Sequence, residues 1–210
     1  MNYIFDFDGT LMDTSGVILA TIKATIQEMQ LPAKTDDECR SIIGIRTDEA
    51  AGHLYPGGGV SDSEFARRFR ANYATLKNGA HENTFPGVIE TLRQLRDSGC
   101  GLAIASSRRL ASLNDYLTGL GIDSWFSMVV GADNVTNGKP NPEPVQKILD
   151  TLGWRPEETM VVGDADVDIM MGNAARCITC AVTYGNGSTE SLKDAAPDFM
   201  VDDFARIPTL

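Results

Sequence analysis

Acidic, hydroxyl and amino side chains stand at or just beyond the ends of four expected β-strands in this sequence. Apolar, often β-branched runs over 3–7, 101–105, 128–131 and 159–163 predict those strands. Their ends carry, in chain order, Asp6 and Asp8, then Ser106 and Ser107, then Lys139, and finally Asp164 with Asp168 close behind. Ligands of open parallel sheets bind outside the carboxyl ends of the strands. These residues therefore form one site if the strand order brings the ends together.

The charges of this set indicate a metal ion and a phosphate. The acidic residues of the first and fourth strand ends, placed together, would repel one another and raise one another's pKa values, and a divalent cation relieves this. Oxygen ligands with water suit Mg²⁺, which in turn attracts a phosphate group. Lys139 supplies a second positive charge. The Ser106 hydroxyl and the Ser107 backbone N–H can hold phosphoryl oxygens near a helix N-terminus.

The most rigidly placed nucleophile of the set is Asp6, at the end of the first strand. No cysteine is a candidate, and neither histidine adjoins an expected strand end. A carboxylate can attack phosphorus and form an aspartyl-phosphate. Asp8, two residues on, can turn back toward the same space, protonate the leaving oxygen and then activate a water. Transfer to phosphorus depends mainly on positioning and charge neutralisation, which this set provides.

The order of the expected helices and strands predicts an α/β fold. Strands alternate with helices through the second half of the chain, which implies a parallel sheet flanked by helices on both faces. The strands lack strict apolar alternation, as expected when both of their faces are buried. Four expected helices over about 15–79 interrupt the pattern after the first strand. We expect a Rossmann-like core domain over 1–13 and 84–210, and an inserted helical cap over 14–83.

An excess of acidic residues argues against several classes of partner. The 210 residues include 18 Lys plus Arg and 29 Asp plus Glu, for a formal net charge of −11. A nucleic-acid binder needs a basic surface, and so does a protein that binds an anionic membrane. No stretch approaches ~18 uninterrupted apolar residues, and the first residues do not resemble a signal peptide. We therefore expect a cytoplasmic protein, while the sequence leaves the oligomeric state open.

Cys177 and Cys180 have the CxxC spacing of some metal and redox sites. A zinc ribbon needs a second such pair, which the sequence lacks. If the segment is a strand, residues three apart point to opposite faces of the sheet. We therefore expect two small buried residues here.

The four strand ends resemble the four motifs of the haloacid dehalogenase-like superfamily, in the same order and over essentially the whole chain. The segment DFDGTL over 6–11 is similar to the first motif, DxDGT. Ser106 fits the hydroxyl residue of the second motif, and Lys139, within GKPNP, fits the third. The segment GDADVD over 163–168 fits the fourth, GDxxxD. The helical insert resembles the cap of the phosphoglycolate phosphatase and β-phosphoglucomutase branch.

This resemblance implies a role for each acidic residue. It makes Asp6 the nucleophile and Asp8 the acid and base, and an aspartate at position 8 favours phosphoryl transfer over dehalogenation. By the same resemblance, Mg²⁺ is held by the Asp6 carboxylate, the Asp8 backbone carbonyl and Asp164. Asp168 supports these ligands through Lys139 or a metal-bound water.

The resemblance also implies a substrate class. Gly9, Thr10 and Ser107 are expected to contact the phosphate, and Arg46 lies near the loop that faces substrate in similar caps. Arg108 and Arg109 follow the second strand, where we expect a solvated helix start, with contact to substrate as the alternative. The whole predicts a Mg²⁺-dependent phosphatase acting on a small phosphorylated metabolite, with phosphoglycolate, a sugar phosphate and a nucleotide all open. A phosphosugar mutase and a non-catalytic phosphometabolite-binding protein are the alternatives.

Overall fold

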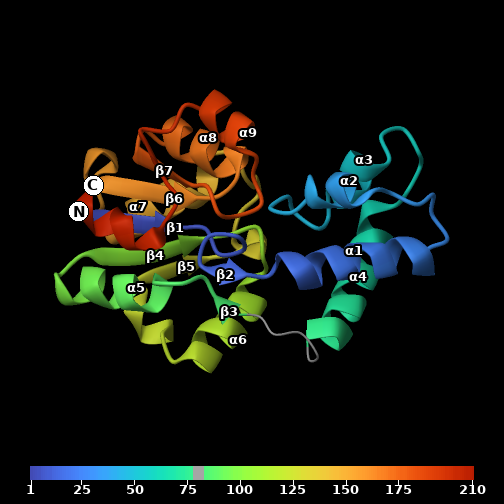
Figure 1. Ribbon diagram of the computed structural model, residues 1–210, viewed down its shortest axis with the longest axis horizontal. Helices are drawn as coiled ribbons and strands as arrows, with labels where there is room; N and C mark the ends of the chain where they lie inside the picture. The colour runs from blue at the N-terminus through green and yellow to red at the C-terminus, as the bar shows by residue number, and fades with distance from the viewer. Residues whose placement is uncertain (78–82) are drawn as a thin grey trace. The chain divides into compact units, whose positions relative to one another are not determined.

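Short apolar segments pair as one parallel sheet in the computed structural model, which describes residues 1–77 and 83–210 (Figure 1). Within those residues the sheet has six strands, in the order β5-β4-β1-β6-β7-β8. They are β1 (Asn2–Phe5), β4 (Gly101–Ala105), β5 (Met128–Val130), β6 (Thr159–Gly163), β7 (Ile178–Val182) and β8 (Phe199–Val201). Each neighbouring pair is parallel, so the predicted α/β fold is confirmed.

The side chains of the strands alternate between two buried faces of this sheet. In β1, Tyr3 and Phe5 point to one face and Ile4 points to the other. In β4, Leu102 and Ile104 lie on the same face as Phe5. Because apolar residues cover both faces, neither face needs polar side chains, and the strands appear in the sequence as continuous apolar runs.

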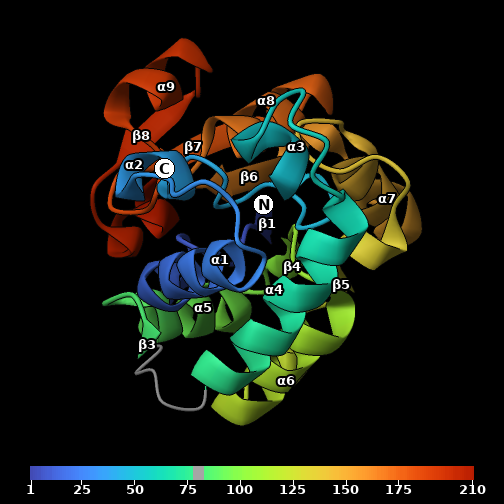
Figure 2. The same cartoon turned by 90° about the vertical axis from the view of Figure 1, so that its right-hand side faces the viewer.

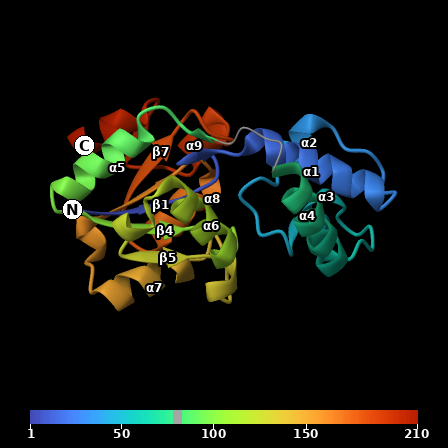
Figure 3. The same cartoon turned by 90° about the horizontal axis from the view of Figure 1, so that it is seen from below.

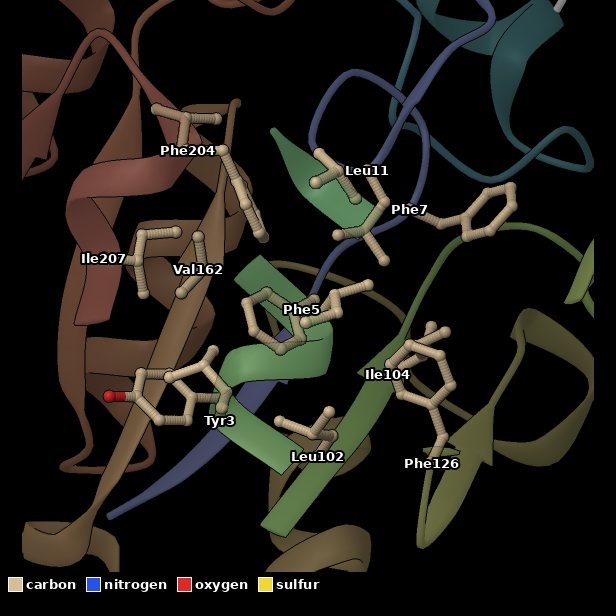
Figure 4. Packing of buried hydrophobic residues seen from close by; sticks show 14 of the residues in the cluster. Tyr3, Phe5, Phe7, Leu11, Leu102, Ile104, Phe126, Val162, Phe204 and Ile207 are labelled. Carbon is tan, nitrogen blue, oxygen red and sulfur yellow. The ribbon is translucent and has the colours of Figure 1, made fainter. Parts of the chain in front are cut away.

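The first face packs the larger side chains. It is covered by α5 (Val88–Asp97), α6 (Leu110–Leu120) and the C-terminal 3₁₀ helix η5 (Phe204–Thr209). Figure 4 shows Phe5 within this layer, and its ring centroid lies 5.6 Å from that of Phe204. Burying a large apolar side chain contributes about 1.5–3 kcal/mol. This layer therefore fixes the position of β1 and, with it, of Asp6, the residue that directly follows the strand.

On the second face of the sheet, a helix packs very close to the strands. This face is covered by α7 (Glu143–Leu152) and α8 (Asp166–Ala174), and α7 lies on the opposite side of the sheet from α5 (Figure 3). A Cβ on Gly172 of α8 would lie 2.6 Å from the Thr179 methyl group of β7 and 3.0 Å from Val161 Cβ of β6. Glycine is therefore required here, and the close contact fixes α8 directly beyond the end of β6.

The remaining elements of this part of the chain are short. They are α9 (Thr189–Asp194) and the 3₁₀ helices η2 (Asp123–Trp125), η3 (Ala132–Asn134) and η4 (Pro156–Glu158). Across residues 1–77 and 83–210, no helix is both long enough and apolar enough to cross a membrane.

A segment inserted between β1 and α5 forms a separate helical unit. One unit comprises Met1–Met12 with Thr84–Leu210, and the other comprises Asp13–Asn83. Its described helices are α1 (Ser15–Glu28), α2 (Asp36–Arg40), α3 (Ala50–Leu54) and α4 (Asp62–Leu76). Helix α1 packs against α4 (Figure 2), and buried side chains such as Ile22 and Phe65 form a core within this unit. The short strands β2 (Met12–Asp13) and β3 (Asn83–Thr84) pair where the chain leaves and re-enters the larger unit.

The CxxC pair is buried in the sheet. Cys177, just before β7, packs on the second face, whereas Cys180 packs on the first. Both are free cysteines, and burial raises the pKa of each thiol to about 12. Thiols that stay protonated are poor ligands and poor nucleophiles. The expectation of two small buried residues is confirmed.

Candidate active site

The strand order brings three of the predicted strand ends together. Strand β1 lies between β4 and β6, and Phe5 is level with Val162 of β6. The backbone N–H of Asp6 continues this ladder by donating to the Val162 carbonyl over 2.8 Å. Ser106 and Asp164 directly follow β4 and β6, so they flank Asp6 on its two sides at the carboxyl edge of the sheet.

Lys139 reaches this edge from the loop before α7 and joins two acidic residues. Its Nζ donates to Oδ1 of Asp6 and to Oδ1 of Asp168, each over 2.5 Å. The Lys139 side chain is only 3% exposed. Burial acts to lower its pKa, but the adjacent carboxylates of Asp168 and Asp6 outweigh burial and raise the pKa above its usual range. Lys139 therefore stays charged and offsets negative charge beside Asp6.

Asp6, Asp164 and Asp168 form a buried acidic cluster. One carboxylate oxygen of each lies within 4.8 Å of the others. Burial raises the pKa of Asp6 well above its usual range, although Lys139 opposes the shift. Burial, reinforced by Asp168, raises the pKa of Asp164 to about 7. Three carboxylates this close together are a donor set that fits a divalent cation, which would offset their repulsion.

Two loops hold the carboxylate of Asp164. The Thr10 hydroxyl donates to its Oδ1 over 3.1 Å. The backbone N–H and the side-chain amide of Asn186 donate to its Oδ2 over 2.7 and 3.2 Å. The Tyr184 hydroxyl donates to the Thr10 carbonyl over 2.8 Å and so links the two loops. Both oxygens of Asp164 are therefore oriented by fixed donors.

Two loop residues that are predicted to contact the phosphate also lie against Asp164. The Thr10 side chain is fully buried and its hydroxyl orients Asp164, and a contact between Thr10 and the phosphate stays a prediction. Gly9 has a φ of 90°, and a Cβ there would collide with the Asp164 carboxylate. Its contact with substrate stays a prediction. Sequence reasoning missed Asn186, although the run GNGS over 185–188, shortly beyond β7, marks a tight loop at the same edge.

We expect Thr10→Val to weaken metal binding more than folding, because valine cannot donate to Asp164. Losing a hydrogen bond that orients a metal ligand typically costs 10–100-fold in affinity, so the Mg²⁺ dissociation constant should rise by about tenfold. Calorimetric titration with Mg²⁺ measures this change. Thr75→Val, at an exposed position of α4, is the matched control. An unchanged dissociation constant for Thr10→Val would contradict the role given to Thr10.

Asp8 pairs with Arg108, and the expectation of a solvated Arg108 is wrong. Arg108 Nε donates to Asp8 Oδ2 over 3.0 Å, and Nη2 donates to Asp8 Oδ1 over 2.5 Å. The Arg108 side chain is 9% exposed. Because β4 and β1 are neighbours, a residue just beyond β4 lies beside the loop after β1. Arg109, by contrast, is 57% exposed and reaches Asp133, which agrees with the expected solvated helix start.

The two serines and Arg46 occupy different surroundings. Ser106 is buried, and its Oγ accepts a hydrogen bond from the Arg108 backbone N–H over 3.2 Å, so its own proton can still be donated. Ser107 beside it is half-buried. Arg46 belongs to the helical unit, where its side chain pairs with Asp48. A contact between Arg46 and substrate stays a prediction.

Comparison with known proteins agrees with this geometry. Residues 3–182 match the family of haloacid dehalogenase-like hydrolases. The chain belongs to this family. The matched segment contains every strand end that carries a predicted site residue, from Asp6 to Asp168. With its helical insertion, this haloacid dehalogenase-like hydrolase falls in the phosphoglycolate phosphatase-like branch, in agreement with the resemblance of the helical insert.

Curated relatives of this hydrolase span almost its full length. "Probable phosphatase IndB" of Dickeya dadantii is 34% identical over 97% of this chain and 90% of its own. "Phosphoglycolate phosphatase" of Pectobacterium atrosepticum is 33% identical, over 97% and 88%. "Pyrophosphatase PpaX" of Oceanobacillus iheyensis is 32% identical, over 99% and 94%.

A solved structure has the same fold. The crystal structure of a "Putative haloacid dehalogenase-like hydrolase" from Bacteroides fragilis superposes with a TM-score of 0.87 at 27% identity. It covers 98% of each chain, so the helical insertion of this hydrolase has a counterpart there as well as the parallel sheet.

Proposed function

We propose that this haloacid dehalogenase-like hydrolase is a Mg²⁺-dependent phosphatase that hydrolyses a small phosphomonoester through an aspartyl-phosphate on Asp6. The position of Asp6 carries the proposal. Its carboxylate lies at the end of the central strand, accepts a hydrogen bond from Lys139, and has an oxygen within 4.8 Å of carboxylate oxygens of Asp164 and Asp168. A nucleophile that is already held in place loses little conformational entropy when it adopts the attacking geometry.

The acidic cluster supplies the ligands for Mg²⁺ in this proposal. Asp6 and Asp164 would bind it directly, together with the Asp8 backbone carbonyl, and Asp168 would support them through its hydrogen bond to Lys139. When bound, Mg²⁺ neutralises charge on the phosphoryl group as that group is transferred. Thr10 and Asn186 keep Asp164 oriented for this purpose.

The first chemical step moves the phosphoryl group to the protein. A carboxylate oxygen of Asp6 attacks phosphorus, the bond from phosphorus to the alcohol oxygen breaks, and Asp8 gives its proton to that oxygen. The Ser106 hydroxyl and the Ser107 backbone N–H hold phosphoryl oxygens through the transfer. Lys139 offsets the negative charge that gathers around Asp6.

The second step releases the phosphate. The Asp8 carboxylate accepts a proton from a water molecule, whose oxygen attacks the phosphorus of the aspartyl-phosphate. The bond from phosphorus to the Asp6 oxygen breaks, inorganic phosphate leaves, and Asp6 returns as a carboxylate. Asp8 is then protonated again and ready for the next alcohol leaving group.

The substrate in this proposal is a small phosphorylated metabolite. Relatives named for phosphoglycolate and for pyrophosphate support that size and charge. The helical unit is proposed to act as a cap that excludes water and selects the part of the substrate beyond the phosphate, with Arg46 as a candidate contact.

A panel of phosphate compounds tests this function. The purified protein with Mg²⁺ is offered p-nitrophenyl phosphate, phosphoglycolate, pyrophosphate, a nucleotide and hexose 1-phosphates, and released inorganic phosphate is measured. We expect stoichiometric release from at least one small ester. Conversion of a hexose 1-phosphate to its 6-phosphate without phosphate release would identify a mutase instead. Tight binding without turnover of any compound would identify a binding protein.

A further inference from the structure

Arg108 is a nearly buried cation beside the site, and the reaction described above gives it no task. Its guanidinium forms hydrogen bonds with two side chains. Nε and Nη2 donate bidentate hydrogen bonds to the Asp8 carboxylate, and Nη1 donates to Ser112 Oγ over 3.1 Å. Its central carbon lies 5.0 Å from the ring centroid of Tyr116 and 5.8 Å from that of Phe7.

This arrangement fixes a direction as well as a charge. A planar guanidinium that donates two parallel hydrogen bonds sets the plane of the carboxylate it meets, which a single ammonium donor does not do. Ser112 and Tyr116 both lie on α6, so that helix anchors Arg108 and, through it, the Asp8 side chain. Asp8 is thus braced by an element that follows β4, while its backbone belongs to the loop after β1.

We propose that Arg108 is the positioning residue for Asp8: it sets the direction from which the Asp8 carboxyl meets the leaving oxygen and, afterwards, the attacking water. The proposal rests on the function proposed above, in which Asp8 is the acid and base. The guanidinium donates two hydrogen bonds to Asp8 and one to Ser112. These contacts favour an action of Arg108 on the reaction through Asp8, and a direct hydrogen bond from Arg108 to the phosphate is the competing interpretation.

Leaving groups of different basicity separate these two readings. An alkoxide leaving group needs a proton from a well-placed acid, whereas p-nitrophenolate leaves readily without one. For Arg108→Met we expect kcat/KM for glycerol 2-phosphate to fall about a hundredfold, the usual effect of a misplaced group. For p-nitrophenyl phosphate we expect a loss of about threefold or less, because general-acid help contributes little there.

A double-mutant cycle tests whether Arg108 works through Asp8. Asp8→Asn alone should show the same preference for p-nitrophenyl phosphate, with a larger loss on glycerol 2-phosphate. Adding Arg108→Met to Asp8→Asn should then cost almost nothing more, since residues that act as one unit are not additive. Arg109→Met, one residue away and exposed, is the matched control and should leave kcat/KM for both substrates unchanged.

Milder variants guard against a folding defect, which thermal melting reports. Arg108→Lys keeps the charge but loses the bidentate hydrogen bonds to Asp8. Its kcat/KM should therefore still fall more for glycerol 2-phosphate than for p-nitrophenyl phosphate, by a smaller factor than in Arg108→Met. Ser112→Ala removes one anchor and should shift the preference in the same direction by a few-fold.

Two results would overturn the proposal in different ways. Equal losses on both substrates for Arg108→Met and Arg108→Lys, adding fully to those of Asp8→Asn, would show that Arg108 holds the phosphate itself. If instead Asp8→Asn has no leaving-group preference while Arg108→Met has one, the acid role of Asp8 in the proposed function is wrong.

Discussion

Asp6→Asn is expected to abolish phosphate ester hydrolysis, with turnover falling at least about ten-thousandfold, as when other covalent nucleophiles are removed. Asparagine keeps the shape of the side chain but cannot donate an electron pair to phosphorus as a carboxylate does. The change should leave the fold intact, because Lys139 retains its hydrogen bond to Asp168. Steady-state release of p-nitrophenolate from p-nitrophenyl phosphate with Mg²⁺ measures the loss.

The control for this prediction is Asp150→Asn, an exposed aspartate on α7, which should keep full turnover. A trapping experiment adds a direct test of the covalent step. Asp8→Asn slows the attack of water, so acid-quenched samples should carry one phosphoryl group on the peptide that contains Asp6. Turnover at the wild-type rate by Asp6→Asn would sink the assignment of the nucleophile.

Removing divalent cations with EDTA is expected to stop turnover, and adding Mg²⁺ should restore it. The reason is the buried cluster of Asp6, Asp164 and Asp168, whose mutual repulsion a cation offsets. The pKa of Asp164 is raised to about 7, and this group must lose its proton to bind a cation. The apparent Mg²⁺ affinity should therefore weaken as the pH falls below about 7.

Thermal unfolding reports the same binding without any substrate. At a free Mg²⁺ concentration about 100 times the dissociation constant, the free energy of unfolding should rise by about 2.7 kcal/mol. Asp164→Asn should lose this stabilisation. Asp166→Asn, in the same segment but outside the acidic cluster, should keep it. Full turnover after exhaustive chelation would contradict the proposed metal requirement.

The strands and most helices could be predicted because their signals are local. The apolar run around Ile4 is bounded by residues that end strands, and the observed β4 and β6 agree with their expected ranges residue for residue. The acidic, hydroxyl and amino residues at the strand ends were visible in the same way, since their types and spacing need no knowledge of the fold. The four helices expected over about 15–79 correspond to the observed α1 to α4.

The surroundings of those residues could not be predicted in the same way. The sequence predicts a solvated Arg108 at a helix start, yet this residue forms hydrogen bonds with Asp8, a hundred positions earlier. The hydrogen bond from Thr10 to Asp164 has no local signal in the sequence, and Asn186 is marked only by the weak signal of a glycine-rich loop. Each of these contacts joins loops that lie next to each other only through strand pairing.

Local patterning in the chain thus specifies the elements and the chemical types that stand at their ends, since hydrophobic period and turn residues act over a few positions. The order β4-β1-β6 is a property of the folded molecule. It places Ser106 and Asp164 on the two sides of Asp6, and it decides that Arg108 braces Asp8 and that Thr10 braces Asp164. Hydrogen bonds between residues a hundred or more positions apart exist only after the sheet has aligned the loops that carry them.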